Sequence, residues 1–221
     1  EVDGVEYVHE RATATQQTGF SFVAQCRPNT INNIGGITWF GVDDAATSCL
    51  TPIYTSVTDA PECVKVGNGN LITYSPTSLF WLTNRVAHMA YLMYDRVAPD
   101  IQAVADKFEN DCIAEQAQID AAALEIMEKA ADKETASAEV RRYLTAYSHA
   151  KAQHLFNTWQ GLDTYFLVKY MDGNVKVQNP DGSFKDNGHS PAIPASPVQP
   201  GYSQKWKEAV VKDAGEILKA E

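Results

Sequence analysis

The chain of 221 residues is 44% hydrophobic and 21% charged, which is the composition of a globular protein rather than of a disordered or fibrous one. Its net charge of −10 and isoelectric point near 4.9 argue against binding to nucleic acids or to anionic membranes, since both depend on clustered Lys and Arg. No apolar run approaches the roughly 20 residues of a membrane-spanning helix, so we expect no membrane span.

Three short runs near the N-terminus predict neighbouring strands. Residues 1–18 suit a connector or an edge strand, and the runs 19–26, 36–42 and 49–55 are rich in aromatic and β-branched residues. Each run is closed by Gly, Pro, Asn or Asp, as in strands joined by short connections. Both faces of the predicted strands carry apolar side chains, so we expect the sheet to be covered on both sides by helices or by a second sheet.

From residue 77 the apolar spacing changes from two to about 3.6, which predicts amphipathic helices. The first helix follows Pro76, and Pro99 restarts the pattern in a second helix that runs to a turn at 132–135. A third helix extends to Gly173, which we expect in the left-handed conformation at the helix end. The second and third helices are long enough to pack as an antiparallel hairpin.

Other segments are less regular. Residues 64–74 suit either a small hairpin or a loop over the core. Residues 174–202 contain five prolines, which predicts an extended loop that lies along the protein surface. Beyond it, the spacing of Trp206, Val210 and Ile217 predicts a C-terminal amphipathic helix docked on an apolar surface.

These elements predict an α+β fold in one domain with three parts. The strands occupy residues 1–75, the helical layer and hairpin occupy 76–173, and the Pro-rich loop and C-terminal helix occupy 174–221. The pattern alone names no function.

Several sequence blocks in order resemble the PepD-type dipeptidases, which are N-terminal-nucleophile (Ntn) cysteine hydrolases. The blocks are TGF-x-FVAQ-x-R, IGG-x-x-WFG-x-DDAAT, a Pro-x-Tyr strand running into VTDAP, and SPTSLFWLTNRVAHMAY. The similarity continues more loosely to about Gly173 and covers the C-terminal half of such an enzyme. It implies that these residues form part of an Ntn-hydrolase αββα sandwich that is incomplete without an N-terminal half.

The resemblance also implies a mechanism. The nucleophile of this family is a Cys at the mature N-terminus, whose own α-amine is the base, and it hydrolyses dipeptides or short amides through an acyl-enzyme. Residue 1 here is Glu, and each cysteine of the chain has an amide nitrogen instead of an amine. We therefore expect no catalytic residue in this chain, a nucleophile upstream of it, and partners in the N-terminal half and a peptide substrate.

Three residues are candidates for contact with the substrate. The resemblance aligns Arg11 with an Arg-containing stretch just before the first strand, where a guanidinium could hold a substrate carboxylate; an ion pair with Glu10 or Asp3 is the structural alternative. His9 lies beside it, although a His in a polar run is more often solvated. Trp39 matches the apolar stripe of its strand and is either core or a wall of the substrate pocket.

The paired acids Asp43 and Asp44 suit acid/base chemistry or Ca²⁺ binding, but such a pair more often caps a turn through Asx hydrogen bonds. His149 and His154 are five residues apart, which does not place two ligands on one helix face. We expect no metal and no cofactor.

The cysteines are Cys26, Cys49, Cys63 and Cys112, without zinc-ligand spacing. An even number permits a disulfide in an exported protein, with Cys49 and Cys63 closing the shortest loop, whereas four buried thiols are the other possibility. We expect an extracellular or periplasmic protein, with the cytoplasm as the alternative.

Two other functions stay open. One is a non-catalytic binding or scaffold module whose helical hairpin presents a partner surface. The other is an amidase of the same superfamily that acts on bile-salt or penicillin-like amides. A homo-oligomer is compatible with either function.

Overall fold

The computed structural model describes residues 2–8, 10, 12–28, 30–217 and 219–220. It divides into two compact units, Glu1–Thr164 and Tyr165–Glu221, and each is described by itself.

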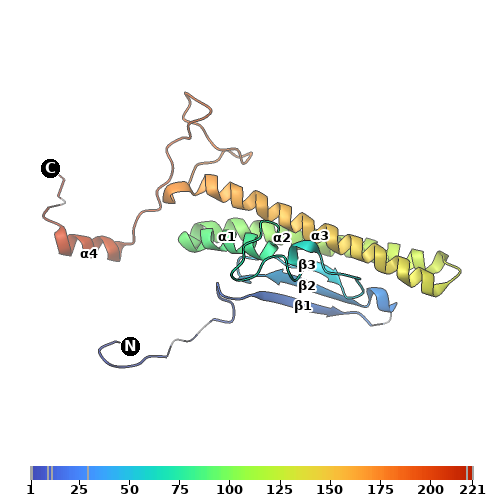
Figure 1. The fold of residues 1–221 in the computed structure, drawn as a ribbon. Helices are drawn as coiled ribbons and strands as arrows, with labels where there is room; N and C mark the ends of the chain where they lie inside the picture. The colour runs from blue at the N-terminus through green and yellow to red at the C-terminus, as the bar shows by residue number, and fades with distance from the viewer. Residues whose placement is uncertain (1, 9, 11, 29, 218, 221) are drawn as a thin grey trace. The chain divides into compact units, whose positions relative to one another are not determined.

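The first unit contains a three-stranded antiparallel sheet of order β1-β2-β3 (Figure 1). Its strands are β1 (Phe20–Cys26), β2 (Gly36–Val42) and β3 (Thr51–Tyr54). The register pairs Phe22 with Phe40 and Trp39 with Pro52, so each predicted strand forms and neighbours the next one in sequence. The fold is α+β, as predicted.

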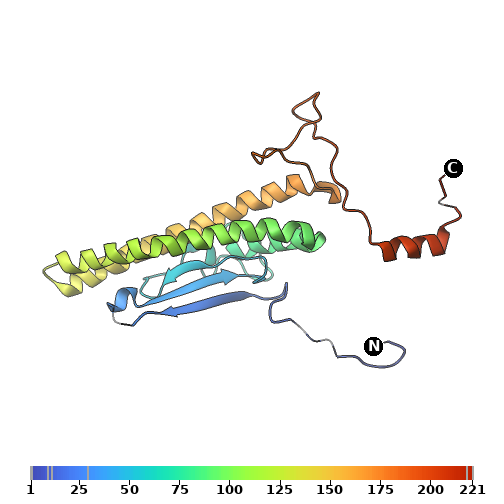
Figure 2. The same ribbon diagram turned by 180° about the vertical axis from the view of Figure 1, so that it is seen from behind.

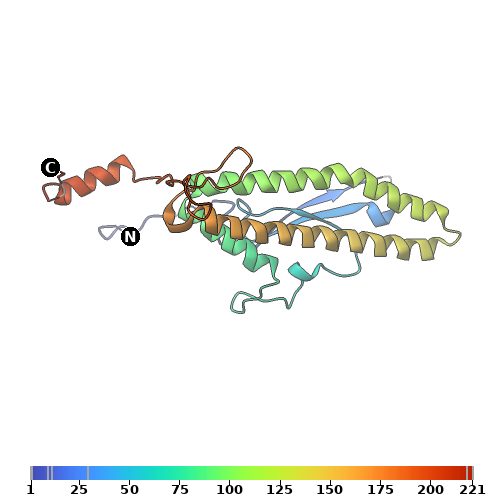
Figure 3. The same cartoon turned by 90° about the horizontal axis from the view of Figure 1, so that it is seen from above.

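The helices are α1 (Leu79–Leu92), α2 (Tyr94–Lys129), α3 (Lys133–Lys169) and α4 (Gln204–Ala214). Figure 3 shows α2 and α3 side by side and antiparallel, as predicted for the hairpin. The boundary between the first two helices was predicted wrongly: the break lies at Met93, where the backbone is non-helical, and Pro99 lies inside α2. The proline removes one backbone donor, but the helix continues through it.

Helices cover one face of the sheet (Figures 1 and 2). Ile37, Trp39 and Tyr54 are buried on this face, and the Tyr54 ring meets the Tyr147 ring edge-on at a centroid distance of 6.0 Å. Gln116 on α2 donates to the Gln25 side chain on β1 at 3.1 Å. Strand alternation thus directs one set of side chains into the helical layer.

The opposite face of the sheet is not covered by the residues that the structure describes. Phe20 and Phe22 are 60% and 58% exposed, and the Phe20 ring stacks on Phe40 with centroids 6.0 Å apart. Cover of this second face therefore stays a prediction. Its premise of apolar side chains on both faces is correct, but the first unit places helices on one side alone.

A part-buried ion pair joins the end of β1 to α2. The Arg27 guanidinium pairs with the Asp120 carboxylate and donates to the Ile34 carbonyl, and the Tyr54 hydroxyl donates to Asp120 at 2.7 Å. Burial, reinforced by the hydrogen bond to Asp120, raises the pKa of Tyr54, so its hydroxyl keeps its proton and remains a donor.

In the second unit, the Pro-rich segment is folded back by isolated β-bridges. Val175 pairs with Val198, and Gln178 pairs with Phe184, whose ring stacks on Tyr165 at 5.9 Å. Gly173 has the predicted left-handed φ of +70°, but α3 ends earlier, at Lys169, and Gly173 lies in the short 3-10 helix Met171–Gly173 that follows. No residue of α4 is buried, so the docking of this helix stays a prediction.

Among the described residues, no helix combines the length and the apolar character needed to cross a membrane.

Candidate functional site

The turn after β2 brings two acidic side chains to the end of the sheet. Asp43 has a φ of +68°, and its backbone N–H donates to the Gly19 carbonyl at 2.8 Å. The Asp44 carboxylate accepts from the backbone N–H of Ala46 at 3.1 Å and from the Thr47 hydroxyl at 3.2 Å. The predicted Asx turn is confirmed for Asp44.

Both carboxyl groups are buried and take partners from α1. The Asn84 amide donates to Asp43 Oδ1 at 3.0 Å, and the Tyr91 hydroxyl donates to Asp44 Oδ2 at 2.7 Å. Asn84 and Tyr91 are seven residues apart, which is about two helical turns, so they lie on one face of α1. Asp43 Oδ2 is buried and has no hydrogen-bond partner among the described residues.

The environments of Asp43 and Tyr91 favour the protonated forms of these two side chains. Burial raises the pKa of Asp43, against the opposing effect of the Asn84 hydrogen bond and the His88 charge. Burial and the adjacent Asp44 raise the pKa of Tyr91 to about 12, so Tyr91 remains a donor at neutral pH. Asp44 acts as a turn cap, whereas Asp43 retains an unused oxygen.

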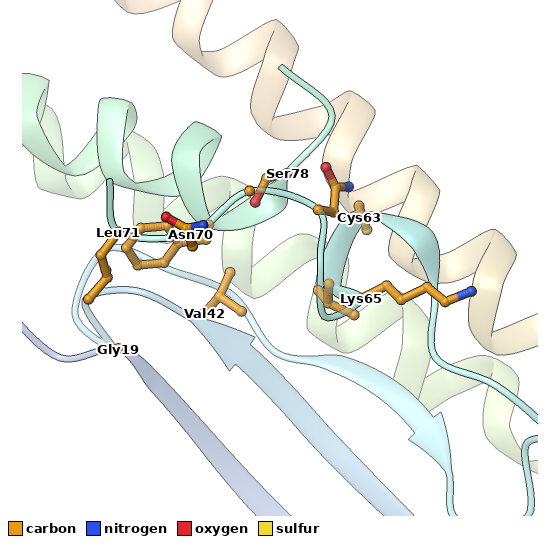
Figure 4. A pocket seen from close by; sticks show the side chains of 11 residues that line it. Gly19, Val42, Cys63, Lys65, Asn70, Leu71 and Ser78 are labelled. Atoms are coloured by element: carbon orange, nitrogen blue, oxygen red, sulfur yellow. The ribbon is translucent and has the colours of Figure 1, made fainter. Parts of the chain in front are cut away.

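A pocket of about 330 Å³ opens beside this turn (Figure 4). Gly19 and Val42 form its floor at the sheet end, and the segment that leads into α1 forms its wall. The complete lining is Gly19, Val42, Cys63, Val64, Lys65, Asn68, Gly69, Asn70, Leu71, Ser78 and Phe80. The pocket therefore joins the sheet end to the loop 64–74, which forms no strand and matches the loop alternative.

Three of the four cysteines are unsuited to nucleophilic attack. All four are free thiols, and Cys49, Cys63 and Cys112 are buried while Cys26 is exposed. Burial raises the pKa of Cys63 and of Cys112 to about 11, and it also raises the pKa of Cys49, so these sulfurs stay protonated at neutral pH. The buried-thiol prediction holds for three cysteines and fails for Cys26, and export stays a prediction without support from a disulfide.

Of the three predicted substrate-binding residues, the structure describes Trp39 alone. His9 and Arg11 lie outside the described residues. Trp39 is buried at 8% exposure on the helix-covered face, and its indole N–H donates to the Gln25 side chain at 2.9 Å. Trp39 is not among the residues that line the pocket, so its place in the core is the better interpretation.

The two histidines of α3 have separate surroundings. His149 Nε2 lies 3.6 Å from the Asp59 carboxylate, whereas His154 stacks on Phe108 with centroids 5.6 Å apart. In the part of the chain that the structure describes, no group of three or more His, Cys, Asp or Glu side chains is placed to hold a metal ion.

Comparison with known proteins relates this region to a family. Residues 4–107 match the family model of peptidase family C69, which is the PepD-type dipeptidase family. The match to peptidase family C69 includes all three strands, the Asp43–Asp44 turn, the pocket loop and α1, and it confirms the resemblance seen in the sequence. No curated protein matches the chain.

The polar contacts between α1 and the turn were not predicted. Asn84, His88 and Tyr91 recur at helical spacing, which could have indicated a polar stripe on α1 facing a buried acid. The pairing of Arg27 with Asp120 had no such signal, because 93 residues separate them. The match to peptidase family C69 supports a peptidase and includes the residues of this polar cluster and pocket.

Proposed function

We propose that these residues are the C-terminal part of a cysteine dipeptidase of Ntn type, whose nucleophilic Cys lies upstream of residue 1. The single observation that carries the proposal is the match of residues 4–107 to peptidase family C69. Dipeptides or other short amides are the proposed substrates.

The state of the thiols supports an external nucleophile. A cysteine nucleophile needs its thiolate and a nearby base, and Cys49, Cys63 and Cys112 are buried with raised pKa values. Cys26 is exposed, but it lies at the end of β1, away from the residues that line the pocket. A peptidase of this family therefore has to obtain its reactive sulfur from other sequence.

The uncovered sheet face supports a missing layer. Phe20, Phe22 and Phe40 present aromatic rings on the side away from the helices, where a second sheet would bury them. Burying an aromatic side chain contributes about 1.5–3 kcal/mol. We propose that this face is the inner face of an αββα sandwich, and that the helices α1, α2 and α3 are its outer layer.

The proposed reaction is amide hydrolysis in two steps. The α-amine takes the proton of the N-terminal thiol and the resulting thiolate attacks the scissile carbonyl carbon; the ammonium then passes this proton to the leaving nitrogen as the C–N bond breaks, which leaves a thioester. Water then attacks the thioester carbonyl, the C–S bond breaks, and the carboxylic acid leaves as the thiol is restored. In this proposal the present chain supplies strands, covering helices and part of the substrate site.

The test compares this chain with the longer protein that includes its upstream sequence. The longer protein is expected to hydrolyse dipeptides and to lose all activity when its first mature residue is changed from Cys to Ala, while the 221-residue chain alone is inactive. If the longer protein hydrolyses no dipeptide, the result supports the alternative of a non-catalytic binding or scaffold module. If it cleaves bile-salt or penicillin-like amides in preference to dipeptides, the amidase alternative is correct.

A further inference from the structure

The pocket beside the Asp43–Asp44 turn lies between the end of β2 and the start of α1. Val42 of β2 and Phe80 of α1 are both among the residues that line it. Its volume of about 330 Å³ lies at the lower end of the range for small-molecule sites.

The described residues that line the pocket are mostly apolar or uncharged, and Lys65 is the charged residue among them. Val42, Leu71 and Phe80 contribute apolar surface, and Asn70 and Ser78 contribute an amide and a hydroxyl. Figure 4 shows the Lys65 side chain extending away from Val42. No acidic residue is among the described residues that line it, so the pocket lacks a partner for a cationic group and suits an uncharged one.

The loop that forms the wall is held in place before any ligand binds. The Asn68 amide donates to the carbonyls of Glu62 and Thr77, and its oxygen accepts from the hydroxyls of Ser75 and Thr77. One side chain thus joins both ends of the loop. A preformed wall of this kind lowers the entropic cost of binding.

Glycine is required at the centre of this wall. Gly69 has a φ of +80°, and a Cβ there would lie 3.0 Å from the Thr73 carbonyl oxygen and 3.2 Å from Trp81 Nε1. The Trp81 indole N–H donates to that same carbonyl at 3.1 Å, which anchors the loop to α1. The loop backbone can follow this path only without a side chain at residue 69.

The ordered loop nevertheless leaves branched apolar side chains in contact with water. Leu71 lines the pocket and is 79% exposed, and its neighbour Ile72 is 95% exposed and does not line it. Covering such side chains with an apolar ligand is favourable by about 25 cal/mol per Å². The two residues differ in their contact with the pocket and are similar in their exposure.

We propose that this pocket binds the uncharged, apolar side chain of a dipeptide substrate. This inference rests on the proposed function and adds to it a substrate class. The enzyme then prefers dipeptides with Leu, Ile or Phe at one position over those with Lys or Asp there, and Leu71 determines part of that preference.

The experiment uses the longer protein and measures kcat and KM for dipeptides that carry Leu, Lys or Asp at each position. Leu71→Asp places a carboxylate at the pocket, so KM for the Leu-containing dipeptide should rise about tenfold. The value of kcat/KM for the Lys-containing dipeptide should rise relative to that for the Leu-containing one. Ile72→Asp makes the same chemical change one residue away and should leave all constants near those of the unmodified protein. Thermal unfolding of each variant checks that the fold is intact.

The outcomes separate the two proposals. An active enzyme in which the Leu71 and Ile72 variants behave alike overturns the pocket assignment and leaves the dipeptidase proposal intact. A Leu71→Asp protein that loses thermal stability with KM unchanged also overturns it, because the pocket is then a contact with the other half. A longer protein without dipeptide hydrolysis overturns both.

Discussion

The two faces of the sheet are built from the same strands and similar residues, but they have different surroundings. Trp39 and Tyr54 are buried under α2 and α3, whereas Phe20 and Phe22 are more than half exposed on the other side. Strand alternation gives each face an apolar set, and the fold of these residues covers one of them. This difference is the structural observation that supports the proposed second layer.

The largest expected effect is on the covered face. Trp39→Ala removes a buried indole and its hydrogen bond to Gln25, and should lower the free energy of unfolding by about 3–5 kcal/mol in this chain. Phe22→Ala, on the opposite face, should cost less than about 1 kcal/mol because the ring is already exposed. Urea denaturation measures both, and equal losses would remove the distinction between the two faces.

The ion pair between Arg27 and Asp120 is a second test of what stabilises the helix-covered face. Asp120→Asn removes the charge that neutralises the part-buried Arg27, and the free energy of unfolding should fall by about 2 kcal/mol. Asp111→Asn on the same helix breaks the exposed pair with Lys107 and is the matched control, with an expected loss below about 0.5 kcal/mol. Similar urea midpoints for the two variants would show that the Arg27 pair does not stabilise the covered face.

The acidic turn at the end of the sheet predicts a dependence on pH. Folding raises the pKa of Asp43, so the unfolded chain releases this proton first as the pH rises above about 3.9. Stability is then lost with rising pH until Asp43 also ionises in the folded chain, and the loss persists above that point.

Asp43→Asn removes that titration and keeps a residue type that tolerates the left-handed backbone. Its free energy of unfolding should therefore decrease less than that of the unmodified chain between about pH 4 and pH 7. The two proteins differ only at residue 43, so the difference between the two urea series isolates Asp43. Parallel series would contradict the burial of an acid at this turn.

The smallest effect is expected at the uncovered face. Cys26→Ser changes an exposed thiol and should alter the free energy of unfolding by less than about 0.5 kcal/mol. Cys112→Ser places a hydroxyl in the core between α2 and its neighbours and should cost about 1–3 kcal/mol. A loss at Cys26 as large as that at Cys112 would mean that the face is already buried.

Features that depend on local periodicity could be predicted from the sequence, whereas features that depend on distant residues could not. The three strands, the helical hairpin and the left-handed Gly173 are consequences of spacing and turn chemistry. The break at Met93 was misplaced because a proline gives a stronger local signal than a non-helical methionine.

The candidate site was less predictable for the same reason. The Asx turn at Asp44 is local and was predicted, but the partners Asn84 and Tyr91 come from a separate helix. The pocket depends on how the loop 64–74 folds over Val42. The weak alternation of apolar and polar residues in this loop does not specify its backbone conformation. The uncovered face could not be predicted from the sequence. Apolar side chains on both faces of the sheet indicate that both faces are buried, but they do not indicate which segment of a protein buries each face.

The most direct test of the account measures how fast iodoacetamide alkylates Cys26 in this chain and in the longer protein. Cys26 lies at the end of β1, on the same face as Phe22, and is exposed in the described structure. We predict rapid modification of Cys26 in the 221-residue chain and a rate as slow as that of buried Cys112 in the longer protein. Equal and rapid modification of Cys26 in both proteins would contradict the proposal that a second layer covers this face.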